Sequence, residues 1–383
     1  MEFLRDLKLG GLKESAFLFG PRMTGKSTLL RSLKASLYID LLNPEIELEL
    51  RQTPRLFWEQ IQTQRKGALI IVDEVQRVPA LLDYVQMGIV ELGLQFILSG
   101  SSARKLKRGG ANLLGGRALD LKLHPLTARE LGDKFNIDLA LQFGTLPKIS
   151  QLILSKDAQG ARRMLQSYYT TYIKEEIQAE ALTRNVGAFQ RFINVAAQDN
   201  GQVIEFSNVS RECSVPDTTV KGYYTILEDT LIGEFLWPWD RSERKKARPK
   251  FYFFDCGVVR AIQNRLNDPP SPLERGVLFE TWFFRELIKY RDAGAREHVF
   301  SFWREGTHEI DILVEGGHGP LLAIECKSGR TDIRRSTVEA FRKRFPSVPL
   351  IVASLTDRVS RRLAMGVDVI PWKDALERYI KIG

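Results

Sequence analysis

Cysteine and histidine are scarce in this chain, which has three cysteines and four histidines among 383 residues. The cysteines, Cys213, Cys256 and Cys326, are odd in number and widely spaced, so they predict neither a disulfide framework nor a zinc knuckle. The small number of histidines also argues against a histidine-rich metal site. A reducing cytoplasm fits a chain of this kind.

Long apolar runs are missing as well. No stretch of the sequence approaches the roughly 18 apolar residues that a membrane-spanning helix needs. Residues 1–6 do not begin a secretory signal, which would combine a basic start with an apolar segment. We therefore expect a cytoplasmic protein with no membrane partner.

Neither sign of charge is lacking, but positive charge is in modest excess. Lysine and arginine number 56 and aspartate and glutamate 47, which gives a formal net charge of +9. This excess favours a polyanionic partner, nucleic acid first, with a surface adapted to solubility as the alternative. The chain is also too long for one ordinary hydrophobic core, so two or three domains are expected.

A glycine-containing loop follows the apolar run 16–19 and precedes a segment with helical character. It consists of Gly20, Pro21, Arg22, Met23, Thr24, Gly25, Lys26, Ser27 and Thr28. Strand, loop and helix in this order are typical of a phosphate cradle, because glycine lets successive backbone N–H groups point inward. Lys26 is then expected to reach the β- and γ-phosphates of ATP, and Ser27 to ligate Mg²⁺.

A second apolar run, 67–72, ends in Asp73 and Glu74. A continuous run of this kind is typical of a parallel strand that is buried on both faces. Next to a phosphate loop, Asp73 is suited to hold the Mg²⁺ shell and Glu74 to orient or deprotonate the attacking water. The alternative is an exposed acidic pair at a strand end, which the preceding loop disfavours.

Two further residues are candidates for nucleotide chemistry. Ser99 follows the apolar stretch 94–98 and is predicted to contact the γ-phosphate or the lytic water, the alternative being a cap on the next helix. Arg117 follows two glycines and is predicted to act as an arginine finger, in cis or from a neighbouring subunit, with an ordinary surface arginine as the alternative. The basic run 103–108 predicts a solvated face.

Together with the stretches 98–102 and 124–131, these motifs resemble the bacterial and archaeal AAA-type ATPases whose C-terminal half carries a restriction-endonuclease-like module. The resemblance implies a doubly wound P-loop core in which Lys26, Ser27, Asp73 and Glu74 take the roles given above. It also favours a homo-oligomer, a hexamer in the AAA-type relatives. It leaves the physiological substrate open.

The middle of the chain predicts helices and one strand. Amphipathic helical character covers 152–185, and shorter helices are expected over the ranges 189–198, 206–212 and 218–229, with a strand over 231–236. This order indicates a winged helix. The third helix offers one lysine against three acids, so packing or a hinge role is favoured over reading a DNA groove. The basic stretch 241–250 predicts a linker or a clamp on a nucleic-acid backbone.

The last third holds a second set of chemical groups. Glu280 lies on an expected helix, Asp311 on an expected strand, and Glu325 and Lys327 on the next strand. Side chains alternate along a strand, so Glu325 and Lys327 are expected on one face, where Asp311 and Glu280 can join them. The three carboxylates suit Mg²⁺ or Mn²⁺, which activates water, while Lys327 steadies the developing charge.

This layout resembles the PD-(D/E)XK nuclease superfamily, including Holliday-junction resolvases. Ile310 stands where the motif has proline. The two resemblances and the pattern of the middle segment together predict an α/β fold in three parts. These are a P-loop AAA-type doubly wound parallel sheet over 1–150, a helical and winged-helix connector over 151–245, and a restriction-endonuclease-like domain over 246–383. A degenerate module that only binds is the alternative to an active nuclease.

These sites predict an ATP-hydrolysing protein that is also a metal-dependent DNA endonuclease, with branched or junction DNA as its substrate and ATP turnover moving or gating that DNA. The alternative, from another class, is an ATPase switch or scaffold whose nuclease-like domain only binds DNA or a protein partner.

Overall fold

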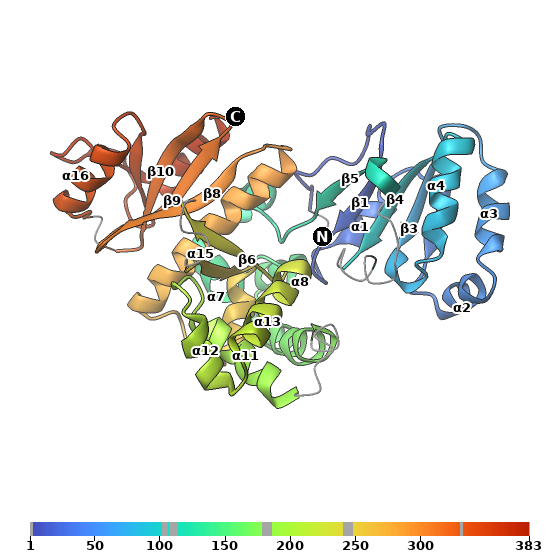
Figure 1. The fold of residues 1–383 in the computed structure, drawn as a ribbon, viewed down its shortest axis with the longest axis horizontal. Helices are drawn as coiled ribbons and strands as arrows, with labels where there is room; N and C mark the ends of the chain where they lie inside the picture. Colours follow the sequence, from blue (N-terminus) through green and yellow to red (C-terminus); the bar gives the residue numbers. More distant parts are fainter. Residues whose placement is uncertain are drawn as a thin grey trace. The chain divides into compact units, whose positions relative to one another are not determined.

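The computed structural model describes residues 3–101, 106, 114–177, 186–239, 248–329 and 332–382 (Figure 1). The basic run 103–108, apart from residue 106, and residues 241–247 of the second basic stretch lie outside this part. The chain divides into two compact units. One is Glu2–Leu126 with Asp229–Ile232, and the other is Thr127–Glu228 with Gly233–Gly383. Within the described ranges, no helix is both long enough and apolar enough to cross a membrane.

The N-terminal unit is built on a five-stranded parallel sheet with the strand order β2-β3-β4-β1-β5. The strands are β1 (Ser15–Phe19), β2 (Leu37–Asp40), β3 (Leu69–Asp73), β4 (Gln95–Gly100) and β5 (Ala118–Lys122). Because all five run the same way, the loops that follow β1, β3 and β4 meet at one edge of the sheet. That edge brings together the predicted phosphate loop, the acidic pair and Ser99.

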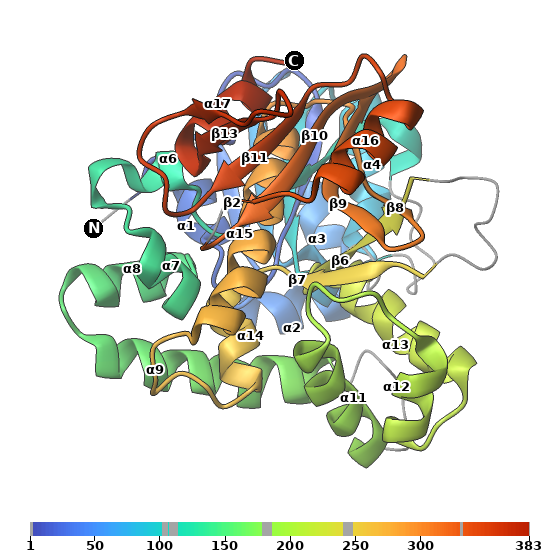
Figure 2. The ribbon, with the colours of Figure 1, turned by 90° about the vertical axis from the view of Figure 1, so that its left-hand side faces the viewer.

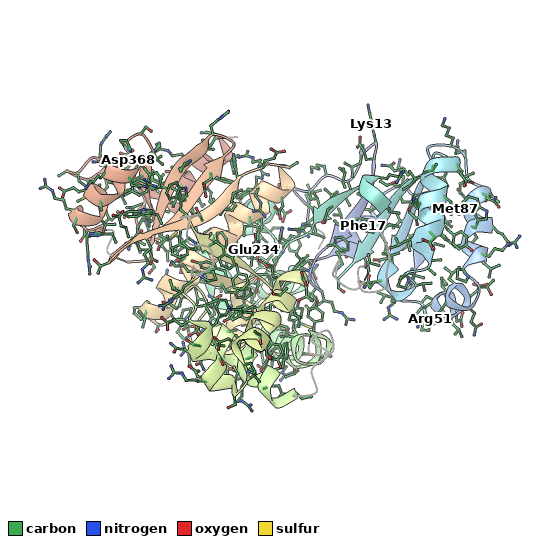
Figure 3. The ribbon with its side chains drawn as sticks, in the orientation of Figure 1. Lys13, Phe17, Arg51, Met87, Glu234 and Asp368 are labelled. Carbon is green, nitrogen blue, oxygen red and sulfur yellow. The ribbon has the colours of Figure 1, made fainter. Side chains whose placement is uncertain are left out.

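Side chains of both faces of this sheet are buried, as the apolar runs predicted. Phe17, which lies on β1 (Figure 3), packs in one cluster with Ile70 and Phe96, whereas Leu18 and Ile71 pack in a second. The helices of this unit are α1 (Lys26–Arg31), α2 (Pro44–Gln52), α3 (Arg55–Gln62), η1 (Val75–Arg77), α4 (Leu81–Glu91) and η2 (Leu114–Gly116). The parallel, doubly covered sheet predicted for this region is confirmed.

The second unit contains an eight-stranded mixed sheet with the order β12-β13-β11-β10-β9-β8-β6-β7. Strands β8, β9 and β10 pair antiparallel, and β10 pairs parallel with β11 (Figure 2). The strands are β6 (Gly233–Pro238), β7 (Lys250–Phe253), β8 (Val299–Glu305), β9 (His308–Gly316), β10 (Gly319–Lys327), β11 (Leu350–Ser354), β12 (Arg361–Arg362) and β13 (Asp368–Pro371). The strands expected in the last third are therefore present.

Helices cover both faces of this sheet. Helix α15 packs Phe283 against Ile312 and Ile324 on one face, and α16 packs Phe341 against Ile310 on the other (Figure 2). The helices of the unit are α6 (Ala128–Leu131), η3 (Gly132–Lys134), α7 (Ile137–Phe143), α8 (Pro147–Leu154), α9 (Ala158–Ser167), η4 (Tyr168–Ile177), α11 (Val186–Gln198), α12 (Phe206–Cys213), α13 (Asp217–Asp229), α14 (Cys256–Ile262), α15 (Pro272–Ala293), α16 (Arg335–Arg344) and α17 (Trp372–Ile380).

The predicted helices at 189–198, 206–212 and 218–229 correspond to α11, α12 and α13. The helical character predicted over 152–185 corresponds, up to residue 177, to the end of α8, to α9 and to η4, and residues 178–185 lie outside the described part. The chain breaks between α8 and α9, because Lys156 adopts a left-handed backbone conformation with φ of 62° and Asp157 caps the start of α9.

The prediction of three domains with boundaries at 150 and 245 differs from the observed division into two units. The middle segment is continuous with the C-terminal part, because β6 pairs with both β7 and β8. Asn200 adds a buried link, since its amide donates to Thr281 Oγ1 (2.8 Å) and its oxygen accepts from the N–H of Phe253 (2.9 Å). The boundary at Thr127 follows from these contacts, which a linear pattern of helices and strands does not contain.

Candidate functional site

The predicted phosphate loop spans residues 20–25, between β1 and α1. Two of its residues need backbone conformations with positive φ, Met23 at 64° and Gly25 at 92°. A side chain at Gly20 would bring its Cβ within 2.4 Å of the backbone oxygen of Leu123, so only glycine fits there. Thr24 Oγ1 donates to Pro21 O (2.9 Å) and fastens the loop internally. The loop is therefore tightly folded before any nucleotide is considered.

Lys26 begins α1 and is 6% exposed. Its Nζ donates to the carbonyl oxygens of Gly20 (2.7 Å) and Pro21 (3.2 Å). Burial lowers the pKa of Lys26, while the charges of Glu74 and Asp73 oppose that shift. Anionic phosphate oxygens are stronger partners for an ammonium than neutral carbonyls, so a nucleotide in the loop can take over these bonds. The residues Arg22, Ser27 and Thr28 remain at least partly exposed around Lys26.

Arg5 was not predicted as a site residue, but its side chain binds the backbone of the phosphate loop. Its guanidinium donates to the backbone oxygen of Thr24 (2.7 Å) and to that of His124 (2.5 Å). One side chain thereby ties the loop to the segment that follows β5. No short motif marks such an arginine, because it contacts only backbone atoms far away in the sequence.

Asp73 is fully buried at the end of β3, and two hydroxyl groups hold its carboxylate. Tyr38 Oη donates to Oδ2 (2.8 Å), and Ser99 Oγ donates to Oδ1. Ser99 Oγ also accepts the N–H of Glu74 (3.0 Å). The hydroxyl of Ser99 is thus bonded to both residues of the acidic pair. Its contact with the γ-phosphate or the lytic water stays a prediction, as does the helix cap. Burial and the nearby Asp73 raise the pKa of Tyr38.

Glu74 is partly exposed and adopts a left-handed backbone conformation with φ of 61°. This conformation is uncommon outside glycine and asparagine, and it turns the chain sharply after the buried strand. Gln76 Nε2 donates to Glu74 Oε2, which fixes the direction of that carboxylate. Gln76 is a second residue that the motif alone does not indicate.

Arg117 does not lie beside the phosphate loop of its own chain. In the parallel pairing of β1 with β5, Ser15 is opposite Ala118 and Phe19 is opposite Lys122. Arg117 therefore lies next to the start of β1, whereas the loop follows its end, about 13 Å away at ~3.3 Å per residue. This register argues against an arginine finger in cis, while the role in trans and that of an ordinary surface arginine both stay predictions.

The second predicted set does come together in the C-terminal unit. Glu280 lies on α15, Asp311 on β9, and Glu325 and Lys327 on β10. Antiparallel pairing places Ile312 opposite Ile324. Asp311 Oδ2 accepts the N–H of Cys326 (2.8 Å), and Lys327 Nζ donates to Glu325 Oε1 (2.6 Å). Strand alternation therefore predicted this part of the cluster correctly.

Burial and mutual repulsion dominate the electrostatics of these carboxylates. Burial raises the pKa of Asp311 well above its usual range, and the charges of Glu280 and Glu325 raise it further. Burial also raises the pKa of Glu325, although the adjacent Lys327 opposes the shift. Groups that influence one another in this way face a common region, as a binding site for a cation requires.

Lys250 and Tyr252 of β7 complete this cluster, although they were not predicted to belong to it. Lys250 Nζ lies 2.9 Å from Glu280 Oε1 and 2.8 Å from Glu309 Oε1. Tyr252 Oη also donates to Glu280 Oε1. Lys250 is 3% exposed, so this last residue of the basic stretch 241–250 is not a clamp on a nucleic-acid backbone. The alternation of Lys250 and Tyr252 on one strand face was the available signal.

Among the described residues, no group of three or more histidine, cysteine, aspartate or glutamate side chains is arranged to hold a metal ion. Glu280 Oε1 already accepts from Lys250 and Tyr252, so this oxygen is occupied by protein donors. Glu325 Oε2 differs. It is buried and has no hydrogen-bond partner within the described part of the chain. A buried carboxyl oxygen without a donor fits a site for a cation between Glu325 and Asp311.

Family models match three consecutive parts of the chain. Residues 13–132 match a model described as an AAA domain. Residues 136–268 match a Domain of unknown function (DUF8612), and residues 275–375 match a Domain of unknown function (DUF4143).

Relatives and solved structures are distant. The uncharacterized protein Rv2008c of Mycobacterium tuberculosis is 24% identical over 306 residues, which is 78% of this chain and 67% of that protein. An uncharacterized protein of Haemophilus influenzae is 22% identical over 293 residues, 68% of this chain and 72% of that protein. The Aeropyrum pernix ORC1 protein in complex with DNA aligns with a TM-score of 0.31 at 13% identity, covering 67% of this chain and 87% of that one.

The match to an AAA domain covers the five-stranded sheet, the phosphate loop and the acidic pair. Lys26 begins α1 directly after the loop, and β3 ends at Asp73. Sequence, geometry and family match therefore agree that residues 13–132 form a P-loop ATPase domain of the AAA type.

Proposed function

We propose that this chain is an ATP-hydrolysing DNA-processing protein whose C-terminal unit is a metal-dependent endonuclease acting on branched or junction DNA. ATP turnover in the N-terminal unit moves or gates that DNA. The observation that carries the nuclease half is the convergence of Asp311, Glu325 and Lys327, with one buried carboxylate oxygen left without a donor in the described part of the chain.

In the ATPase half, each step has a residue suited to it. Lys26 neutralises the β- and γ-phosphates, and Ser27 and Asp73 hold the Mg²⁺ ion of the nucleotide. Bound Mg²⁺ supplies charge compensation to the phosphates. Glu74 orients the attacking water and accepts its proton, and Ser99 keeps the backbone of Glu74 in place through the 3.0 Å hydrogen bond.

In the nuclease half, Asp311 and Glu325 hold a Mg²⁺ or Mn²⁺ ion. The ion, when bound, lowers the pKa of water and polarises the scissile phosphate. Lys327 lies 2.6 Å from Glu325 Oε1, so its ammonium adjoins the oxygens that hold the metal. It stabilises the negative charge that develops on the phosphate as the new bond forms. The acid on β9 beside the Glu-x-Lys pair on β10 is the arrangement that the resemblance to PD-(D/E)XK nucleases implies.

A second candidate function follows from the absence of a three-carboxylate metal group among the described residues. In this alternative the N-terminal ATPase is a switch or scaffold, and the C-terminal unit only binds DNA or a protein partner. Lys250 supports it, because its buried ammonium already neutralises part of the carboxylate cluster.

Lys327→Ala separates these two functions. We expect wild-type protein with Mn²⁺ to cleave forks or four-way junctions, and the variant to cleave them at least tenfold more slowly while its ATPase rate is unchanged. Cleavage is measured on labelled branched and linear duplexes with and without ATP. Lys381→Ala, an exposed lysine of the same unit, serves as the control. Wild-type protein that cuts none of the substrates, or an undiminished rate in Lys327→Ala, would refute the nuclease half.

We also propose that the ATPase works as a homo-oligomer, a hexamer by the AAA-type resemblance, because Arg117 can reach a phosphate site only on a neighbouring chain. Arg117→Ala should lower turnover at least tenfold without weakening ATP binding, and wild-type turnover per chain should rise with protein concentration. Full turnover in Arg117→Ala, or a monomer in the presence of ATP at every concentration in sedimentation, would exclude the role in trans.

A further inference from the structure

Lys250 is an unusual component of the carboxylate cluster because its charge is almost completely removed from water. Its side chain is 4% exposed, and Nζ lies 2.9 Å from Glu280 Oε1, 2.8 Å from Glu309 Oε1 and 3.7 Å from Asp311 Oδ1. Burial of an ammonium is costly unless anions surround it. Although burial favours the neutral amine, the surrounding acidic groups raise the pKa of Lys250 well above its usual value. Three carboxylates therefore surround Nζ as ion-pair partners.

Lys250 satisfies one side of the cluster. Glu280 Oε1 accepts from both Lys250 and Tyr252. Glu309 pairs with Lys250 through Oε1, and its Oε2 lies 3.7 Å from the half-exposed Arg304. The oxygens of Glu280 and Glu309 that face Lys250 are thus already bound to positive or donating groups.

The opposite side of the cluster has fewer donors. Glu325 is 7% exposed, and its Oε1 accepts from Lys327 while Oε2 has no partner in the described part of the chain. Asp311 accepts the N–H of Cys326 at Oδ2 and meets Lys250 only at the longer distance of 3.7 Å. Four carboxylates face two lysines and the peripheral Arg304. Fully ionised, the four carboxylates would carry one negative charge more than these three cations supply.

We infer that Lys250 is the built-in cation of this cluster, so that the site takes a single divalent cation, held by Asp311 and Glu325, and not a pair. This inference rests on the proposed metal-dependent nuclease and specifies its metal content. Glu280, predicted from the sequence as a metal ligand, anchors Lys250 instead. A second divalent ion between Glu280 and Glu309 would have to displace the Lys250 ammonium, because like charges repel strongly at contact distance.

Counting bound Mn²⁺ tests this directly. The full chain without nucleotide is titrated with Mn²⁺, and bound ion is measured by electron paramagnetic resonance. The double variant Asp311→Asn, Glu325→Gln serves as the blank for ions bound elsewhere. We expect wild-type protein to bind one ion more than the blank, Lys250→Arg also one, and Lys250→Met two. The melting temperature of Lys250→Met should fall without metal and rise with Mn²⁺ by more than that of wild type.

Each other result would overturn the inference. Two ions in wild type would mean that Lys250 does not replace one of them, and none would mean that the cluster excludes metal. One ion in Lys250→Met, with no larger thermal gain than wild type, would make Lys250 a purely structural residue. If Lys250→Met does not fold, the numbers of Mn²⁺ ions bound by wild type and by Lys250→Arg still test the inference. A wild-type protein that binds one ion yet cuts no DNA would refute the proposed nuclease and leave this inference standing.

Discussion

ATP hydrolysis should fall more than a hundredfold in Lys26→Ala. The ammonium of Lys26 is the positive side-chain group buried in the phosphate loop, where it donates to Gly20 O (2.7 Å) and Pro21 O (3.2 Å). Removing one preorganised donor from a dry site that stabilises developing charge costs about 10²–10³ in rate. The loss should appear both in phosphate release at saturating ATP and in the thermal stabilisation that ATP gives the protein.

Lys34→Ala is the matched control, because Lys34 is exposed and lies just after the same helix. It should keep the wild-type rate. If Lys26→Ala hydrolysed ATP within tenfold of wild type, the loop at 20–28 would not be the ATPase site, and the assignment of Asp73 and Glu74 would fail with it.

Gly144→Ala should lower the free energy of unfolding of the C-terminal unit by about 2–6 kcal/mol, as a backbone strain of ~1–3 kcal/mol at positive φ adds to an overpacking cost of ~1–3 kcal/mol. Gly144 ends α7 with φ of 73°, and a Cβ there would lie 1.8 Å from Asp255 Oδ1. The side chain of Asp255 cannot move away easily. It is buried, and its carboxylate accepts the N–H groups of Thr145 (2.7 Å) and Val258 (3.2 Å).

Gly132→Ala isolates the backbone part of this cost. Gly132 also has a positive φ, 55°, but nothing lies within 4 Å of the position its Cβ would take. Gly132→Ala should lower the free energy of unfolding by only about 1–3 kcal/mol, the backbone cost of a positive φ in alanine. Urea denaturation followed by tryptophan fluorescence gives both values. Equal losses in the two variants would show that the contact with Asp255 has no energetic weight.

Strand periodicity predicts some members of the carboxylate cluster and not others. Alternation along one strand is a local property, so the common face of Glu325 and Lys327 could be predicted from residues 321–327 alone. The pairing of β9 with β10 joins two strands that are adjacent in sequence, and Asp311 was therefore placed correctly as well. Lys250 was not, because it reaches the cluster from β7, which joins the sheet through β6 and a parallel pair between β6 and β8.

In the ATPase site, too, the contiguous motifs could be predicted from the sequence, whereas the contacts between distant residues could not. The loop at 20–28 and the acids at the end of β3 are each contiguous, and their conformations follow from glycine and from burial of the preceding strand. The residues that fix their geometry, Arg5, Tyr38 and Ser99, come from separate parts of the chain. The role of Arg117 in cis was left open for the same reason, since only the register of β1 with β5 tells which end of the sheet it occupies.

By itself, the sequence predicted the phosphate loop, the acidic pair, the Glu-x-Lys pair of β10 and the α/β class of the chain, because each depends on residues within a few positions of one another. Tertiary structure alone decided that the chain forms two units instead of three, that a lysine from a basic stretch is buried among acids, and that Glu280 anchors this lysine. Each of these depends on pairing between distant strands, whose free energy comes from burying side chains that no local pattern brings together.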